Sequence, residues 1–163
     1  MARLPAAVLA LAAASAPVLA PASPTSVAAQ STPLMSVALF GKPSATYVLC
    51  PSTAKEHDDC LPAGHASGPA ALGVIRSAAL TRGIRRIVVF VAGYHTNLPA
   101  GRRDAQNIAQ VLGPEFLVIH ADWGSRGEAA AYESDGVQAK LQTPAFAAFV
   151  ADLHRAVPER ELD

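Results

Sequence analysis

The sequence IVVFVAGYHTN at residues 87–97 decides the fold of this protein. Its first five residues are β-branched or aromatic, which is typical of a strand buried on both faces in a parallel sheet. A glycine-containing turn follows at the carboxyl end of the strand, where open α/β sheets bind their ligands. The stretch therefore predicts a buried parallel strand that leads into a candidate site.

Strands and helices alternate after this stretch. Apolar residues at positions 105, 108, 109 and 112 recur at helical spacing, which predicts a helix from about Arg102 to the break at Gly113-Pro114. The apolar run at residues 116–121 predicts the next strand. An alternation of this kind with short connections predicts right-handed crossovers, a parallel sheet and an α/β fold.

A further helix is predicted near the end of the sequence. Thr143 is a favoured N-cap residue, and Pro144 fits the first helical turn. Apolar residues at helical spacing follow over residues 146–157, and Pro158 is expected to end the helix.

The residues before the decisive strand are less regular. Short strands are expected at residues 35–40 and 46–50, joined by a turn at 41–44, which together form a β-hairpin. Residues 62–73 are rich in Gly, Pro and Ala and are expected to form a loop, and residues 74–80 a short helix.

Composition excludes some classes of function. The 163 residues carry 13 basic and 13 acidic side chains, and 51% of them are hydrophobic. Such a balance excludes a polybasic nucleic-acid binder and an acidic disordered tail, so no nucleic-acid partner is expected. No sequence pattern indicates a cofactor.

The N-terminus has the pattern of a secretory signal peptide over residues 1–29. Arg3 gives a positive start, residues 6–16 an apolar stretch, and Val27-Ala28-Ala29 a small-residue cleavage site before Gln30. We expect a periplasmic or secreted protein with no membrane contact after cleavage. An uncleaved membrane anchor is the alternative.

Two cysteines fit an exported protein. An even number of cysteines in an oxidising compartment favours a disulfide between Cys50 and Cys60. The alternative is a metal site formed by Cys60 with His57, Asp58 and Asp59, although four adjacent residues cannot all face one ion.

Two motifs carry a family resemblance. Residues 92–97 read AGYHTN where a group of proteins has His-Gly-Tyr-Asn-Thr, and residues 122–127 read DWGSRG where it has Trp-Pro-Ser-Arg-Gly. The chain thus resembles a bacterial α/β-hydrolase-like family of unknown function (DUF900-like). Three residues differ from the pattern: Ala92 replaces His, His95 replaces Asn, and Gly124 replaces Pro. Tyr132 and Asp135 also stand where the family has an aromatic residue and an acid.

The resemblance implies an oxyanion hole in the turn. Its donor would be the backbone N–H of Tyr94, and Gly93 would allow the substrate to approach the backbone closely. The substrate would be a small ester or acyl compound. The alternative is an ordinary turn between a strand and a helix. His95 is expected to be a loop residue, because the superfamily's catalytic His comes last in chain order.

The nucleophile of such a hydrolase is not found. Ser125 follows the second core strand, but Trp123 occupies the first glycine position of the G-x-S-x-G elbow, and we expect no strand-turn-helix there. The string at residues 64–68 has its serine in the wrong place. We therefore expect only the first half of an α/β-hydrolase-type core, at residues 81–163, preceded by the hairpin part at 30–80.

Three functions remain open at this point. The first is a truncated, serine-type ester or acyl hydrolase that is not catalytically competent alone. The second is a non-catalytic exported binding or scaffold protein, completed by dimerisation through the exposed edge of the 87–91 strand. The third is an enzyme that uses His120 and Asp122 as metal ligands, since both lie on one face of a strand end.

Overall fold

One mixed sheet forms the centre of the protein. The computed structural model describes residues 33–41, 46–61, 65–157 and 161–162. Within them the strand order is β2-β1-β4-β3-β5, with β1 and β2 antiparallel and the other neighbours parallel. The strands are β1 (Leu34–Phe40), β2 (Thr46–Leu49), β3 (Arg86–Val91), β4 (Phe116–Asp122) and β5 (Glu161–Leu162).

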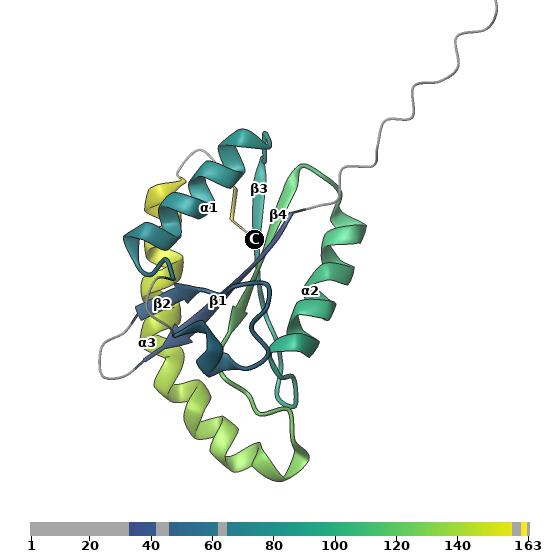
Figure 1. Ribbon diagram of the computed structural model, residues 1–163, viewed down its shortest axis with the longest axis vertical. Coiled ribbons are helices and arrows are strands. Elements are labelled where there is room, and N and C mark those ends of the chain that lie inside the picture. The colour runs from purple at the N-terminus through teal and green to yellow at the C-terminus, as the bar shows by residue number, and fades with distance from the viewer. Residues whose placement is uncertain (1–32, 42–45, 62–64, 158–160, 163) are drawn as a thin grey trace, which may run out of the picture.

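Helices cover both faces of this sheet. One layer is α2 (Leu98–Leu112), and the other contains α1 (Pro69–Thr81) and α3 (Tyr132–Ala156), as Figure 1 shows. Two short 3₁₀ helices, η1 (His57–Cys60) and η2 (Ala129–Ala131), lie in the connecting loops. This arrangement confirms the predicted α/β fold.

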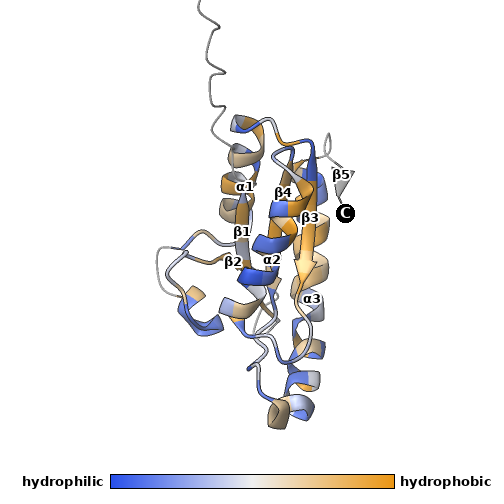
Figure 2. Cartoon of the chain, turned by 90° about the vertical axis from the view of Figure 1, so that its right-hand side faces the viewer, coloured by the Kyte–Doolittle hydropathy of each residue, from blue (hydrophilic) through white to orange (hydrophobic). Residues whose placement is uncertain are grey.

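The core has two halves because successive side chains of a strand point to opposite faces of the sheet. Ile87, Leu117 and Ile119 are fully buried on the face covered by α1 and α3, where they pack with Phe149 in the main cluster. Val118 points to the other face and packs against α2. Figure 2 shows that β3 and β4 are hydrophobic, while α2 presents hydrophilic residues outward.

The predicted hairpin is confirmed and is joined to the rest of the sheet. Val37 pairs with Leu49 in antiparallel register, and Leu34 pairs in parallel with Val118 on β4. The predicted turn residues 42–44 and the predicted signal peptide lie outside the described residues. Among the helices that the structure describes, none is long and apolar enough to cross a membrane.

Two helices begin earlier than predicted. α1 begins at Pro69, so the expected loop at 62–73 is wrong from that residue on. Proline fits a first helical turn, where its missing N–H costs no hydrogen bond. α2 begins at Leu98, not near Arg102, because the Asn97 side chain caps it by accepting a hydrogen bond from the Ala100 N–H at 3.1 Å.

The prediction that a helix begins at Thr143 is wrong. α3 is continuous through Pro144, and the Thr143 hydroxyl donates to the Ala139 carbonyl one turn earlier at 3.2 Å. Proline removes one helical hydrogen bond, but burial of Ala145 and Phe149 keeps the helix on the sheet.

The first residues of β3 are paired on both sides. Arg86 and Ile87 pair with Glu161 and Leu162 of β5 in parallel register. The expectation that the whole strand is a sheet edge is therefore wrong at its start. In the described part of the chain, residues 88–91 pair only with β4.

Candidate functional site

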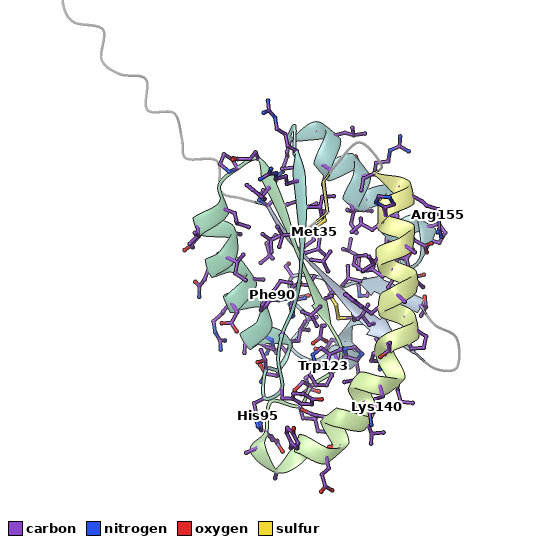
Figure 3. All side chains as sticks on the ribbon, turned by 180° about the vertical axis from the view of Figure 1, so that it is seen from behind. Met35, Phe90, His95, Trp123, Lys140 and Arg155 are labelled. Atoms are coloured by element: carbon purple, nitrogen blue, oxygen red, sulfur yellow. A yellow bond between two sulfur atoms is a disulfide. The ribbon has the colours of Figure 1, made fainter. Side chains whose placement is uncertain are left out.

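The turn after β3 and the loop after β4 lie at the same end of the sheet. β3 ends at Val91 and β4 at Asp122, so residues 92–97 and 123–128 follow neighbouring parallel strands. Figure 3 shows His95 and Trp123 at this end of the molecule. The predicted site regions are thus brought together.

Trp123 holds the turn in place. Its indole N–H donates a hydrogen bond to the Ala92 carbonyl at 2.7 Å. The Tyr94 ring meets the Trp123 ring edge-on, with centroids 5.4 Å apart, and lies 5.1 Å from the Tyr132 ring. These contacts give the turn a defined backbone path.

The predicted oxyanion donor is free within this turn. The backbone N–H of Tyr94 donates to no residue of the described segments. An added Cβ at Gly93 would meet no atom within 4 Å, so the space beside this residue is open. His95 adopts φ +65°, a left-handed conformation that non-glycine residues rarely occupy, and its side chain is exposed.

A small apolar cavity of about 240 Å³ lies beside the turn. Val91 and Tyr94, both more than two-fifths exposed, contribute to its walls. The other lining residues are Leu39, Ala92, Gly93, Trp123, Ala139, Gln142, Thr143 and Phe146.

Ser125 has a structural role in the loop after β4. Its hydroxyl donates to the Asp135 carboxylate at 2.7 Å and accepts from the Gly127 N–H at 3.3 Å. A helix does follow this strand, contrary to expectation, but only after the loop and η2. The buried Asp135, at the start of α3, thus anchors the loop through Ser125.

A partly buried imidazole–carboxylate pair lies at the end of β4, formed by Asp122 and His57 of η1. His57 Nδ1 is 2.5 Å from Asp122 Oδ2, and the Asp122 side chain is 3% exposed. His57 Nε2 is buried and has no hydrogen-bond partner within the described segments. His57, Ser125 and Asn97 line a larger polar cavity of about 620 Å³.

The family assignment rests on a match over more than half of the chain. Residues 73–163 match the family described as alpha/beta hydrolase of unknown function (DUF900). The chain belongs to this family. A search of curated proteins found no match, and a search of solved structures also found none.

Membership of the α/β-hydrolase family agrees with the position of β5. By the resemblance, the strand that carries the nucleophile in α/β-hydrolases would lie next to residues 87–91, and β5 pairs in parallel with Arg86 and Ile87 on that side of β3. No described residue of β5 is a serine. The family match therefore agrees with the fold but identifies no nucleophile in this chain.

The disulfide between Cys50 and Cys60 is present, and the alternative metal site is not formed. Asp59 directs its carboxylate to the N–H groups of Lys55 and Glu56, at 2.8 and 3.0 Å, and these bonds lower the pKa of Asp59. No group of three or more His, Cys, Asp or Glu in the described segments is placed to hold a metal ion.

His120 is not placed as a metal ligand. It is fully buried beneath α2, its ring centroid is 6.0 Å from that of Phe90, and both ring nitrogens lack partners in the described part. Burial lowers the pKa of His120, and this outweighs the opposing effect of the nearby Asp122. Asp122 itself pairs with His57.

Sequence reasoning missed the His57–Asp122 pair. The two residues are 65 positions apart, and the family motifs cover only Asp122. The cysteine spacing gave one usable signal, since a disulfide between Cys50 and Cys60 must fold the residues between them into a compact loop.

Proposed function

We propose that this chain forms the oxyanion side of a serine-type hydrolase that cleaves ester or acyl bonds. The observation that carries the proposal is the backbone N–H of Tyr94 at the carboxyl end of β3, which donates to no described residue, while β5 pairs with the amino end of the same strand. A preorganised N–H donor of this kind stabilises the oxyanion of a tetrahedral intermediate. The family to which the chain belongs supports the reaction class.

The register of β5 supports the same placement. Ile87 pairs with Leu162, so polypeptide that extended β5 in this register would run alongside residues 88–91. A strand of that kind would end next to Gly93 and Tyr94. A nucleophile in the turn that follows it would then face the Tyr94 N–H.

The apolar cavity beside the turn supports an apolar acyl group in the substrate. Its volume of about 240 Å³ suits a short chain or a small ring. Because Val91 and Tyr94 are partly exposed, a substrate could reach the cavity from solvent.

The attacking serine in this proposal does not come from residues 1–163. The printed sequence contains no G-x-S-x-G, and the hydrogen bonds of the Ser125 hydroxyl fix it to the loop and to Asp135. The chain alone is accordingly proposed to be inactive, and activity requires a nucleophile supplied by other polypeptide.

We also propose that the protein is exported and that its signal peptide is removed. The disulfide between Cys50 and Cys60 supports this location, because such bonds persist in oxidising compartments. N-terminal sequencing of protein from the native host should start at Gln30. A sequence that starts at residue 1 or 2 would contradict cleavage.

A fluorophosphonate probe tests the catalytic proposal in protein from the native host. We expect labelling of a serine that is not among residues 1–163, and hydrolysis of a short-chain p-nitrophenyl ester. Labelling of Ser125 would contradict its structural role. Absence of both labelling and hydrolysis would contradict a serine-type enzyme.

A backbone substitution tests the oxyanion donor in the active preparation. Replacement of the amide before Tyr94 by an ester, through semisynthesis, exchanges the N–H for an oxygen without changing any side chain and should lower kcat by about 100- to 1,000-fold. The matched control is Gln106→Ala on the exposed face of α2, which should leave kcat unchanged. Equal kcat for the ester variant and the control would rule out the Tyr94 N–H as donor.

A second candidate function is a non-catalytic binding or scaffold protein that dimerises through β3. It is favoured by residues 88–91, which pair on one side only within the described residues, and by Val91, which is 43% exposed. Light scattering should then show a dimer that Val91→Lys dissociates, whereas the control Val111→Lys, at a more exposed position on α2, does not. A monomeric wild type would rule out this candidate.

A further inference from the structure

We propose that residues 132–140 of α3, here called the cover segment, form a hinged cover on the turn that carries Tyr94. The cover segment detaches from the turn as a unit, independently of the rest of the helix. Its attachment depends mainly on a buried hydrogen bond from Ser125 to Asp135. The role of the segment as a cover of the candidate site rests on the proposed function, whereas its detachment does not and is tested without catalysis.

The two halves of α3 are buried to different degrees. Phe149 and Leu153, in the second half, are fully buried in the main core cluster. Within residues 132–140, all of which the structure describes, Asp135 is the only buried side chain. Burial of apolar area therefore holds the second half of the helix on the sheet and contributes little to the cover segment.

Pro144 weakens the connection between the two halves. Because proline has no N–H, the helical hydrogen bond to the Lys140 carbonyl is missing. Just before the proline, the Gly41 N–H donates to the Gln142 side chain, and this bond ties the helix to the end of β1. The helix is thus fixed at Gln142, and the cover segment can hinge about this point.

The cover segment contacts the candidate oxyanion turn directly. The Tyr132 ring lies 5.1 Å from the Tyr94 ring, and a Cβ at Gly136 would be 3.9 Å from the Tyr94 hydroxyl. Figure 3 shows this part of α3 extending past the end of the sheet toward the turn that carries His95. Ala139 lines the apolar cavity beside the turn. Detachment would therefore widen the cavity and release the Tyr94 side chain.

The Asp135 carboxylate fastens the cover segment to the loop after β4. It accepts a hydrogen bond from the Ser125 hydroxyl at 2.7 Å and a longer one from the Arg126 N–H at 3.4 Å. A buried carboxylate that loses a donor is costly, so these bonds favour the attached state. The same loop carries Trp123, whose indole N–H holds the Ala92 carbonyl of the turn.

A detached cover segment should also unwind. It is shorter than the roughly 12 residues that an isolated helix needs in water. Its backbone amides should therefore exchange with solvent in the detached state, and their exchange rates report the opening. Trp123 is the only tryptophan in the sequence and is buried in the same cavity wall, so its fluorescence reports the opening as well.

Hydrogen exchange of the full chain tests the proposal. We expect the amides of residues 136–140 to share one opening free energy and to exchange about tenfold or more faster than those of residues 149–156. Ser125→Ala should speed exchange of residues 136–140 by a further factor of about ten and increase acrylamide quenching of Trp123, without changing residues 149–156. The control Ser77→Ala, at an exposed position on α1, should change neither readout.

Pro144→Ala is an independent variant that supplies the missing N–H at an exposed position. It should slow exchange of residues 136–140 by about threefold or more. The proposal is overturned if exchange rates fall gradually from residue 136 to residue 156, because this indicates simple fraying of the helix end. It is also overturned if folded Ser125→Ala speeds both halves equally, or if both variants leave residues 136–140 unchanged. Absence of fluorophosphonate labelling beside the expected exchange results would contradict the proposed function alone.

Discussion

Gly101 on α2 faces His120 on β4 so closely that a Cβ at position 101 would overlap the imidazole ring. Both residues are buried, and His120 is fully shielded from solvent. Gly101→Ala should therefore destabilise the fold by about 1–3 kcal/mol, as overpacking does. Urea unfolding measures the change.

Gly73 provides the matched control for this prediction. It also lies inside a helix, α1, but an added Cβ there meets no atom within 4 Å. Gly73→Ala should stabilise the protein by about 0.5–1 kcal/mol, because alanine has the higher helix propensity. Equal effects of the two variants would show that helix propensity, not contact with His120, decides the outcome.

Stability should fall with acidification because of His120. Burial lowers its pKa in the folded state below the ordinary value of 6.5, although Asp122 opposes the shift, so the unfolded chain binds the proton more readily. The stabilisation is fully present above about pH 6.5 and is lost as the pH falls toward the folded-state pKa.

The measurement is the free energy of unfolding from about pH 8 to about pH 5. His120→Leu should reduce the loss of stability over this range, because the variant has no imidazole to protonate at this position. His154→Leu, at an exposed position, should retain the wild-type profile. A His120→Leu profile as steep as that of the wild type would contradict the assignment.

Trp123→Phe should loosen the turn after β3. The substitution leaves the Ala92 carbonyl, now bonded by the indole N–H at 2.7 Å, without its donor in a buried place. We expect a loss of about 1–3 kcal/mol in unfolding free energy and faster amide exchange in residues 92–97. Tyr132→Phe, an exposed position, should change stability by less than about 0.5 kcal/mol.

Reduction of the disulfide should destabilise the protein by about 2–4 kcal/mol. The double variant Cys50→Ser/Cys60→Ser should unfold at the same urea concentration with and without dithiothreitol, while the oxidised wild type should unfold at a higher one. If dithiothreitol left the unfolding midpoint of the wild type unchanged, the bond would contribute nothing to stability.

Much of the sheet could be predicted because its signal is local. The apolar runs of β3 and β4 are typical of strands that are buried on both faces of a sheet. Residue types that favour turns separate the short strands at 34–40 and 46–49 in the sequence. Helix starts were less predictable. Asn97 caps α2 through its side chain, and Pro144 lies inside α3 because burial of Phe149 outweighs one missing hydrogen bond.

The candidate site could be predicted only where a motif covers it. The 92–97 turn and the loop with Ser125 follow strands and could be located, although the anchoring of Ser125 by Asp135 could not. The pairing of His57 with Asp122 depends on a loop that the disulfide and Arg102 fold over the end of β4. Such a contact arises from tertiary packing and leaves no pattern in either segment.

The pairing of β1 with β4 forms late during synthesis of the chain, because the two strands are far apart in the sequence. Leu34 meets Val118, 84 positions later, whereas Cys50 and Cys60 are only 10 positions apart. During synthesis from the N-terminus, the cysteine loop can close while β1 still awaits its inner neighbour. A nascent chain would therefore carry the short cysteine loop beside an open strand until residue 122 has emerged, and this interval is when aggregation is most to be expected.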